Sequence, residues 1–258
     1  MLAPRIIPVL LLDGRRLVKT TRFGDARYVG DPINAVRIFN QKEVDELILL
    51  DITATAQGRG PQFDFIREIA SEAFMPVCYG GGLTTLGQLE KLFALGIEKI
   101  SLGTAGEKLP GLIGEAAATF GSQSVVACVD FKRRLLGGPT AATRRGQHDL
   151  KRKPADYGRA AQEAGAGEIL LQSVDRDGMM NGYDLPVVAD VAKAISVPLI
   201  ACGGAGSLKD VAAALAHGAS AAAAGSLFVF HGKLRAVLIS YPSREELLAL
   251  AAHRGAHP

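Results

Sequence analysis

VCYGGGLTTLGQLEKLFALGIEKISLGTA, residues 77–105, has a counterpart later in the chain, LIACGGAGSLKDVAAALAHGASAAAAGSLF, residues 199–228. In each copy an apolar run leads into a glycine cluster, an amphipathic stretch, a second apolar run and a further glycine. Gly81 corresponds to Gly203 and Gly103 to Gly225, and both pairs are 122 residues apart. A strand, a turn, a helix and a second strand form the unit of a parallel sheet covered by helices. The repeat therefore predicts two structurally equivalent halves.

The same alternation extends over the whole chain. Apolar runs predict eight parallel strands, at Arg5–Leu11, Glu46–Asp51, Pro76–Tyr79, Lys99–Leu102, Ser124–Asp130, Glu168–Gln172, Val197–Cys202 and Ser220–Ala224. Amphipathic stretches predict helices at Pro32–Val44, Gln62–Ala73, Leu86–Leu95, Pro110–Phe120, Pro154–Ala164, Leu185–Ile195, Leu208–His217 and Arg244–Ala252. No linker divides the chain, and about 250 residues is a typical length for a (β/α)8 barrel. We therefore predict an α/β fold, a single (β/α)8 (TIM) barrel over residues 1–258, with half-barrels at about 1–122 and 123–240 and a last helix to about residue 252.

The composition is that of an ordinary globular protein. Hydrophobic residues make up 48% of the chain, charged residues 21%, and the formal net charge is +3, which does not suggest a nucleic-acid partner. The longest uncharged stretch, residues 211–230, fits a helix and a buried strand better than a membrane span, and the first apolar run is too short for a signal peptide. We expect a cytoplasmic protein. Cys78, Cys128 and Cys202 are widely spaced in apolar runs, which favours buried core thiols over a disulfide or metal site. We expect neither a metal nor a cofactor.

Each glycine cluster lies between a strand and a helix, where the backbone can approach an anion closely and donate amide hydrogen bonds to it. The first half offers a phosphate site at Gly81, Gly82, Gly103 and Thr104, and the second offers one at Asp177, Gly178, Gly203, Gly204, Gly225 and Ser226. In barrels the loops after strands seven and eight often bind phosphate. The alternative is that the glycines only form tight turns. Because both halves carry the cluster, the repeat favours a substrate with two phosphate-like ends.

Carboxylates follow several of the expected strands. Asp51, Asp130, Asp175 and Asp177 lie at or just beyond carboxyl-terminal strand ends, where barrel enzymes place catalytic groups. Asp130 ends an apolar run, and a carboxyl group that faces a partly closed cavity has a raised pKa suited to proton transfer. The alternative for each aspartate is a cap of the following loop. Lys19 follows the first strand and could bind a phosphate or a developing negative charge, although a lone lysine is more often solvated.

Four charged residues open strands at the opposite end of the barrel, namely Arg5, Glu46, Lys99 and Glu168. Two cations and two anions that converge on a barrel floor should pair with one another, because an unpaired buried charge is costly. Their spacing alone favours a structural ring that closes and stabilises the floor.

The chain resembles the cyclase subunit of imidazole glycerol phosphate synthase, HisF, over essentially its whole length. The segments that carry the resemblance are RIIPVLLLDGRRLVK, DELILLDITA, PVCYGGG, EKISLGTA, FGSQSVVACVD, GAGEILLQSVDRDG, GYDL and IACGGAGSL. The resemblance implies a (β/α)8 barrel with a glutaminase subunit on its floor. Ammonia from the glutaminase would pass through the barrel to a bis-phosphorylated ribulosyl-carboxamide substrate at the rim, giving imidazole glycerol phosphate and an aminoimidazole product. It also implies that Arg5, Glu46, Lys99 and Glu168 are the gate of the ammonia passage, and this interpretation replaces the purely structural one.

The rim departs from the family pattern at an acid. In the family the first strand carries an aspartate that works with the strand-five aspartate, here Asp130, but this chain has Leu11 in its place. Asp13, two residues further on, would need a shifted backbone to substitute. Other rim contacts to substrate are expected from Lys19, Asp51, Gln172 and Cys202; glutamine and cysteine replace the usual threonine and serine, and Gly103 replaces an asparagine. Loss of one proton-transfer group lowers a rate by about 10²–10⁴-fold, which puts cyclase activity in doubt.

Other segments fit a sister family better. GDPINAVRIFNQKEVDELILLDI, EIASEAFMPVCYGGG and AVLISYPSREEL are similar to the HisF-like proteins associated with glycosyl amidation, the WbuZ type. That resemblance implies a HisH-like glutaminase partner and an ammonia supply to a separate sugar amidotransferase, which makes acetamidino sugars for surface polysaccharides. We predict this function, as a lyase-type or ammonia-transferring synthase subunit. The alternatives are a genuine cyclase of histidine biosynthesis and a non-catalytic scaffold that activates a glutaminase, and the kept glycine clusters speak against the scaffold.

Overall fold

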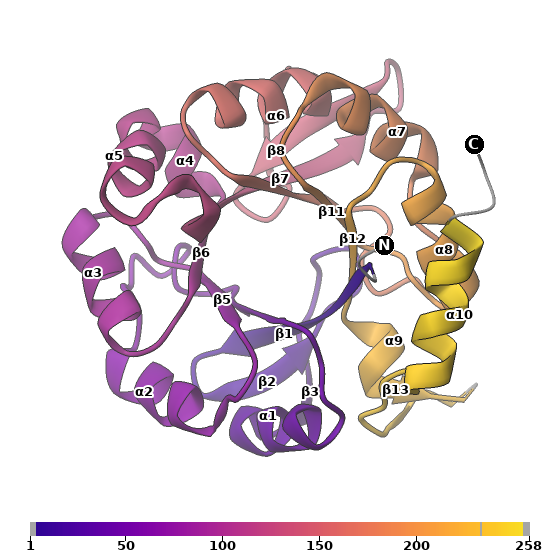
Figure 1. Ribbon diagram of the computed structural model, residues 1–258. Coiled ribbons are helices and arrows are strands. Elements are labelled where there is room, and N and C mark those ends of the chain that lie inside the picture. The colour runs from indigo at the N-terminus through magenta and orange to yellow at the C-terminus, as the bar shows by residue number, and fades with distance from the viewer. Residues whose placement is uncertain (1–3, 233, 255–258) are drawn as a thin grey trace.

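Eight parallel strands form a closed barrel in the computed structural model, which describes residues 4–232 and 234–254 (Figure 1). Around the barrel they are β1 (Arg5–Asp13), β4 (Leu47–Asp51), β5 (Val77–Gly80), β6 (Lys99–Leu102), β7 (Val125–Arg133), β10 (Glu168–Ser173), β11 (Leu199–Cys202) and β12 (Ala221–Ala224). The barrel closes because β12 pairs in parallel with β1. The predicted single (β/α)8 TIM barrel is confirmed, and the limits of the two half-barrels stay a prediction.

Helices surround the barrel as an outer ring (Figure 1). They are α1 (Pro32–Gln41), α2 (Phe63–Glu72), α3 (Leu86–Ala94), α4 (Thr104–Lys108), α5 (Pro110–Phe120), α6 (Pro154–Glu163), α7 (Leu185–Ala194), α8 (Leu208–Ala216), α9 (Ser226–Val229) and α10 (Arg244–Arg254), with a 3-10 turn at Ser122–Ser124. Helix α1 begins where the Asp31 carboxylate accepts a hydrogen bond from the amide of Asn34 at 2.8 Å, with Pro32 in the first turn. It ends before the predicted Val44 because Glu43 has a φ of 53°. None of the helices within the described residues is long and apolar enough to cross a membrane.

Antiparallel hairpins extend the barrel sheet above its rim in both halves, and the sequence did not predict them. After β1 the chain forms β2 (Arg16–Lys19) and β3 (Arg27–Gly30), and after β7 it forms β8 (Pro139–Thr143) and β9 (His148–Asp149). Because of this pairing β1 and β7 run beyond their predicted ends at Leu11 and Asp130. A short pair, β13 (Phe230–His231) and β14 (Ala236–Val237), lies apart from the barrel sheet.

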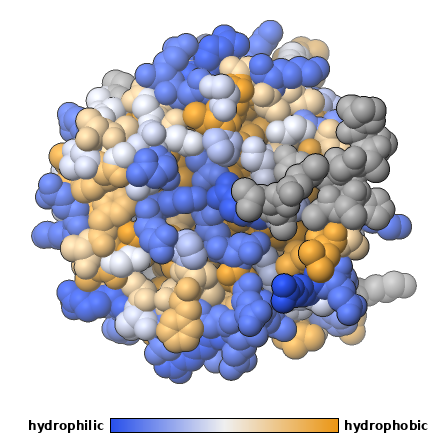
Figure 2. Space-filling view, in the orientation of Figure 1, coloured by the Kyte–Doolittle hydropathy of each residue, from blue (hydrophilic) through white to orange (hydrophobic). Residues whose placement is uncertain are grey.

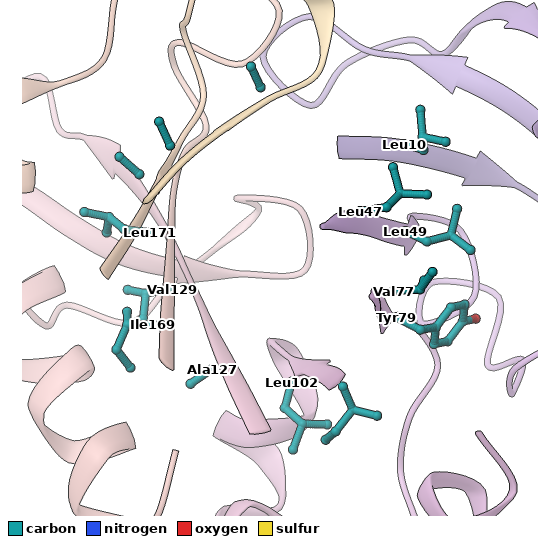
Figure 3. Close-up of a cluster of buried hydrophobic side chains, with 14 of the residues drawn as sticks. Leu10, Leu47, Leu49, Val77, Tyr79, Leu102, Ala127, Val129, Ile169 and Leu171 are labelled. Carbon is teal, nitrogen blue, oxygen red and sulfur yellow. The ribbon is translucent and has the colours of Figure 1, made fainter. Parts of the chain in front are cut away.

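Alternate strand residues build two separate cores. Leu47 and Leu49 of β4 belong to the core between strands and helices, and Figure 3 shows them beside Tyr79 of β5. Ile48 and Cys78, between these positions, belong to the cluster inside the barrel. The lumen of the barrel is therefore apolar between its charged floor and its polar rim.

Candidate functional site

Four charged side chains meet at the amino-terminal ends of the strands. Arg5, Lys99 and Glu168 begin β1, β6 and β10, and Glu46 immediately precedes β4. Nη1 of Arg5 donates to Oε2 of Glu46 at 2.6 Å, and its Nη2 donates to Glu168. Nζ of Lys99 donates to Oε1 of Glu46 at 3.1 Å and to Oε2 of Glu168 at 3.0 Å. Each cation therefore bridges both carboxylates in a closed ring, which we call the floor quartet.

The carboxylates of the floor quartet are the more deeply buried partners. Glu46 and Glu168 are 2% and 4% exposed, whereas the side chains of Arg5 and Lys99 keep 31% and 21% of their surface exposed. Burial opposes the charged form of each cation, but the two carboxylates outweigh it and raise the pKa of both Arg5 and Lys99. Both cations thus stay charged at neutral pH and balance the two carboxylates. Figure 2 shows hydrophilic residues gathered around the barrel axis on the face it presents.

The three cysteines line the lumen rather than the outer core. Cys78 and Cys202 are buried, as predicted, and burial raises the pKa of the Cys78 thiol. Cys128 is only partly buried because it lies at the edge of a cavity on the rim, so the prediction of a core thiol was wrong there. All three are free thiols.

A cavity of about 460 Å³ opens at the carboxyl-terminal ends of the strands, and we call it the rim cavity. Strand ends and the turns after them contribute the predicted residues Leu11, Asp51, Gly81, Gly103, Thr104, Asp130 and Gln172 to its lining. Its lining also includes Lys108 of helix α4 and, from the β8–β9 turn, Arg144, Arg145 and Gln147. Gly82 is not among its lining residues, and its amide donates to Oγ1 of Thr55 at 3.3 Å. The structure therefore brings most of the predicted first-half site together, without Gly82.

Asp130 faces this cavity without a carboxylate partner on β1. It is in register with Gln172 of β10, and Sγ of Cys128 donates to its Oδ1 at 3.4 Å. Leu11, which is 5% exposed, lines the same cavity and keeps its wall apolar. Burial raises the pKa of Asp130 to about 7. A carboxyl group with this pKa can both donate and accept a proton at neutral pH.

The second half holds a far smaller cavity, of about 20 Å³. Its lining includes Lys19, Gln172, Asp177, Gly178, Cys202, Gly203, Gly204, Gly225 and Ser226, and we call it the lysine pocket. Lys19, the last residue of β2, is buried, and its Nζ donates to the carbonyl oxygen of Val9. A Cβ atom on Gly225 would lie 2.6 Å from this Nζ, so the ammonium group lies directly against the glycine. Burial lowers the pKa of Lys19 to about 8, against the attraction of Asp177. The Lys19 ammonium group therefore borders the predicted second phosphate position on its Gly225 side, and that position stays a prediction.

Asp177 and Asp175 are both engaged in holding loops. The Asp177 carboxylate accepts from Oγ1 of Thr20 at 2.6 Å and from the amide of Phe23 at 3.4 Å, which fixes the β2–β3 loop. Asp175 accepts from the amide of Arg133 at 2.7 Å. Both contacts fit the alternative given for these aspartates in the sequence analysis, that each caps the loop after its strand.

Two arginines on the β8–β9 turn complete the mouth of the rim cavity, and sequence reasoning missed both. Nη2 of Arg145 donates to the carbonyl oxygens of Phe23 at 2.7 Å and Gly24 at 3.0 Å, across the mouth. The amide of Arg144 donates to Oγ1 of Thr104 at 3.1 Å. Both arginines have positive φ, at 50° and 58°. The two consecutive arginines, in the segment between the expected strand that ends at Asp130 and the expected helix that begins at Pro154, were the one sequence signal of this wall.

Two further predicted rim carboxylates pair with arginines that are close to them in the sequence. Asp51 accepts from the amide of Ala54 at 3.0 Å and from Nη1 of Arg59 at 3.0 Å, so it caps its own loop although it also lines the rim cavity. Asp13 pairs with Arg16 at the end of β1 and lines neither the rim cavity nor the lysine pocket. The structure therefore does not place Asp13 where it could substitute for the missing acid.

The glycines at the matched positions of the repeat lie in equivalent surroundings. A Cβ atom on Gly81 would collide with the carbonyl oxygen of Asp51 at the end of β4, and one on Gly203 would collide with that of Ser173 at the end of β10. Their φ angles are 121° and 89°, which favour glycine. Tight-turn geometry by itself accounts for these two glycines.

Several known proteins are similar to this chain over most of its length. Residues 5–235 match a family described as "Histidine biosynthesis protein". The chain is 52% identical over 248 residues to a Pseudomonas aeruginosa protein carrying the imidazole glycerol phosphate synthase subunit name hisF2, which covers 96% of this chain and 99% of that protein. It is 47% identical over 248 residues to one of Vibrio vulnificus carrying the name hisF3, covering 95% of each chain. Identity to the imidazole glycerol phosphate synthase subunit HisF of Streptomyces coelicolor is 42% over 234 residues, 91% of this chain and 93% of that protein.

Proposed function

This chain belongs to the histidine biosynthesis protein family, and from that premise we propose that it is a HisF-type synthase subunit that conducts ammonia through its barrel. The observation that carries the proposal is the floor quartet, a closed ring of four charges at one end of an apolar lumen. Neutral ammonia can enter such a lumen, whereas an ammonium ion would lose its hydration there. The lumen ends beside Asp130, whose pKa near 7 suits proton transfer.

A glutaminase of the HisH type is the proposed source of the ammonia. It would dock over the floor quartet, because ammonia must enter where Arg5 and Lys99 keep part of their surface exposed. An Arg5 or Lys99 side chain that swings aside would break contacts to Glu46 and Glu168, and the partner would compensate for them. We place this complex in the cytoplasm.

For the destination of the ammonia we propose a separate sugar amidotransferase that makes amidino sugars for surface polysaccharides. Leu11 supports this, since the cavity beside Asp130 lacks the first-strand acid of a cyclase and Asp13 points to Arg16 instead.

A cyclase and lyase of histidine biosynthesis is the second candidate. One observation favours it: with a pKa of about 7, Asp130 alone could act first as a base and then as an acid. A scaffold without chemistry has less support, because such a chain has no need of a large rim cavity.

A single assay distinguishes the two candidate functions. We would supply the purified protein with the bis-phosphorylated ribulosyl-carboxamide substrate and ammonium salt, with a HisF that has the first-strand aspartate as positive control. The amidino-sugar proposal expects turnover lower by about 10²–10⁴-fold than in the control. Turnover at the control rate would assign the chain to histidine biosynthesis.

The gate is tested separately from the chemistry. In a Leu11→Asp background with measurable cyclisation, a glutaminase from the same genome is added, and glutamine-dependent rates are compared with ammonium-dependent rates. Lys99→Met is expected to alter the glutamine-dependent rate and leave the ammonium-dependent rate unchanged. Added ammonium can reach the rim from solvent without passing the floor quartet. Equal glutamine-dependent rates with and without Lys99 would return the floor quartet to a structural role.

A further inference from the structure

The hairpin of β7 and β8 ends in an apolar tip above the rim. The two strands are last paired at Arg133 and Pro139, and the loop between them contains Leu135 and Leu136. Leu135 is fully exposed and Leu136 is 93% exposed, and no other two consecutive large apolar side chains in the described part of the chain are as exposed. Single exposed leucines are common on soluble proteins, but two together on a projecting tip indicate a surface for binding.

Two ion pairs hold the base of this tip. Arg133 donates to the carboxylate of Asp184, just before α7, through Nε at 2.8 Å and through Nη2 at 2.7 Å. Arg134 donates to Asp149 of β9 through the same two atoms, at 2.8 Å and 2.9 Å. A bidentate arginine pair constrains direction as well as distance. The two leucines therefore project from a base that is held on both sides.

Positive charge gathers beside the tip. A cavity of about 440 Å³ lies between the hairpin and helices α6 and α7 (Figure 1), and its lining contains one acidic residue, Asp190, and four cations, Arg134, Lys151, Arg152 and Lys153. Within the residues that the structure describes, the side chains of Lys151 and Lys153 form no hydrogen bond or ion pair. Their charges are therefore available to an anionic surface.

The charge of the whole chain is uneven in the same region. Residues 132–153 contain eight of the 29 lysines and arginines but only one of the 26 aspartates and glutamates. This segment carries a net charge of +7, so the remainder of a chain with a net charge of +3 carries −4. A basic segment on an otherwise acidic molecule directs that one face toward a polyanion.

An anionic membrane surface suits both features of the hairpin. Apolar side chains at the tip can enter the boundary between head groups and acyl chains, while the cations at its base stay among anionic head groups. A nucleic acid presents phosphates and would leave the leucines in water. A stable protein interface buries on the order of 1,200–2,000 Å², which is far more than two leucine side chains provide.

We propose that the β7–β8 hairpin is a peripheral membrane-binding element, which inserts Leu135 and Leu136 into an anionic lipid surface and places Lys151 and Lys153 among its head groups. This inference goes beyond the proposed function and does not depend on it. The tip lies at the end of β7 away from the floor quartet, so a membrane-bound chain would leave the floor open to a glutaminase.

Co-sedimentation of the full chain with lipid vesicles measures the binding. Vesicles of phosphatidylcholine and phosphatidylglycerol at about two to one supply the anionic surface, and phosphatidylcholine alone supplies the neutral one. Binding to the anionic vesicles is expected to be stronger by about tenfold or more and to weaken at high salt, because salt screens exposed charges. Equal binding to both vesicles, or none to the anionic vesicles at low salt, would overturn the proposal. The second result would favour a protein partner instead.

The leucines are tested by removing their apolar surface. Leu135→Ser/Leu136→Ser is expected to bind anionic vesicles roughly tenfold or more weakly, because two apolar side chains no longer leave water. Phe74→Ser is the control, since it removes an 87% exposed apolar side chain between α2 and β5, at the floor end of the barrel. Equal binding by the leucine variant and the unmodified chain would contradict the insertion. Circular dichroism confirms that each variant is folded.

The lysines are tested at constant net charge. Lys151→Gln/Lys153→Gln is expected to weaken binding to the anionic vesicles by roughly tenfold and to reduce its salt dependence. Lys42→Gln/Lys193→Gln removes the same two charges at the ends of α1 and α7 and should bind like the unmodified chain. If the two double variants bind equally, net charge rather than the hairpin causes the attraction, and the proposal fails.

Fluorescence locates the part of the chain that enters the lipid. The chain contains no tryptophan, so Leu136→Trp introduces a single fluorophore at the tip and Phe74→Trp introduces one at the floor end. Emission of Leu136→Trp is expected to shift to shorter wavelength on anionic vesicles and to be quenched by brominated lipid, whereas that of Phe74→Trp should not change. Sedimentation with the vesicles without a shift at Leu136→Trp would show that another surface binds them.

Discussion

The floor and the rim of this barrel differ in how their buried charges are paired. At the floor, Arg5 and Lys99 each bridge Glu46 and Glu168, so every charge has partners within the ring. At the rim, Asp130 accepts a hydrogen bond from the Cys128 thiol, and neither Arg144 nor Arg145 forms an ion pair within the described part of the chain. The floor is complete without a ligand, whereas the rim is not. The floor is therefore a closed barrier that must open before a molecule can pass through it. The rim is a site whose charges need a bound ligand.

Removing one carboxylate should affect the floor more than any change at the rim. Glu168→Ala leaves Arg5 and Lys99 with Glu46 alone, so the buried cluster gains a net positive charge. The free energy of unfolding is expected to fall by roughly 3–5 kcal/mol, measured by urea unfolding. Glu68→Ala is the control, since its exposed pair with Arg15 should contribute less than about 1 kcal/mol. Equal losses in the two variants would mean that water screens the floor quartet as it screens the surface.

The unpaired acid at the rim, Asp130, should make the stability of the protein depend on pH. Burial holds the pKa of Asp130 at about 7 in the folded protein, above the value of about 3.9 in an unfolded chain. The folded state therefore binds this proton more tightly, and the resulting stability is fully present below about pH 4 and lost as pH rises through 7.

Asp130→Asn lacks this titration. The stability of the unmodified protein relative to Asp130→Asn should fall by roughly 2–3 kcal/mol between pH 4 and pH 8, less than the full shift allows because Asp130 borders a solvent-accessible cavity. Urea unfolding at both pH values measures it, with the exposed Asp64→Asn as control. A difference that does not change with pH would mean that Asp130 is ionised in the folded protein and that its surroundings compensate its charge.

Restoring the missing acid should make the rim more like a cyclase rim. Leu11→Asp places a carboxyl group on β1 in the cavity that Asp130 faces, and it is expected to raise cyclisation with ammonium salt by about 10–100-fold. Leu11→Asn is the matched control, because it has the same shape and polarity without a titratable proton. If both variants stay at the original rate, the rim has diverged at more positions than Leu11.

The barrel itself was accessible from sequence because its strands are buried on both faces and read as continuous apolar runs. Strand β6 and helix α5 have the predicted bounds, Lys99–Leu102 and Pro110–Phe120. The hairpin strands β2, β3, β8 and β9 were missed because they are short and carry no apolar alternation, and they form by pairing with the ends of β1 and β7.

The candidate site was also predictable from the sequence only in part. Residues at strand starts share one level of the barrel, so the meeting of Arg5, Glu46, Lys99 and Glu168 followed from their positions. The place of the Lys19 ammonium group did not, because a long side chain can reach solvent, a phosphate or, as here, the carbonyl of Val9. Contacts between distant loops, such as that of Arg145 with the β2–β3 loop, leave no trace in local spacing.

The smallest expected effect compares two matched glycines of the rim. A methyl group on Gly103 meets Cys128 at an ordinary contact distance, whereas one on the equivalent Gly225 displaces the Lys19 ammonium group from Val9. Gly103→Ala should therefore change the free energy of unfolding by less than about 0.5 kcal/mol, and Gly225→Ala should lower it by about 1 kcal/mol, the net value of one hydrogen bond. In a Lys19→Ala background the cost of Gly225→Ala should disappear, because the colliding group is gone. If Gly225→Ala still lowers the free energy of unfolding in that background, the loss comes from a contact with the backbone of β1. The second half of the rim would then be as closely constrained as the floor.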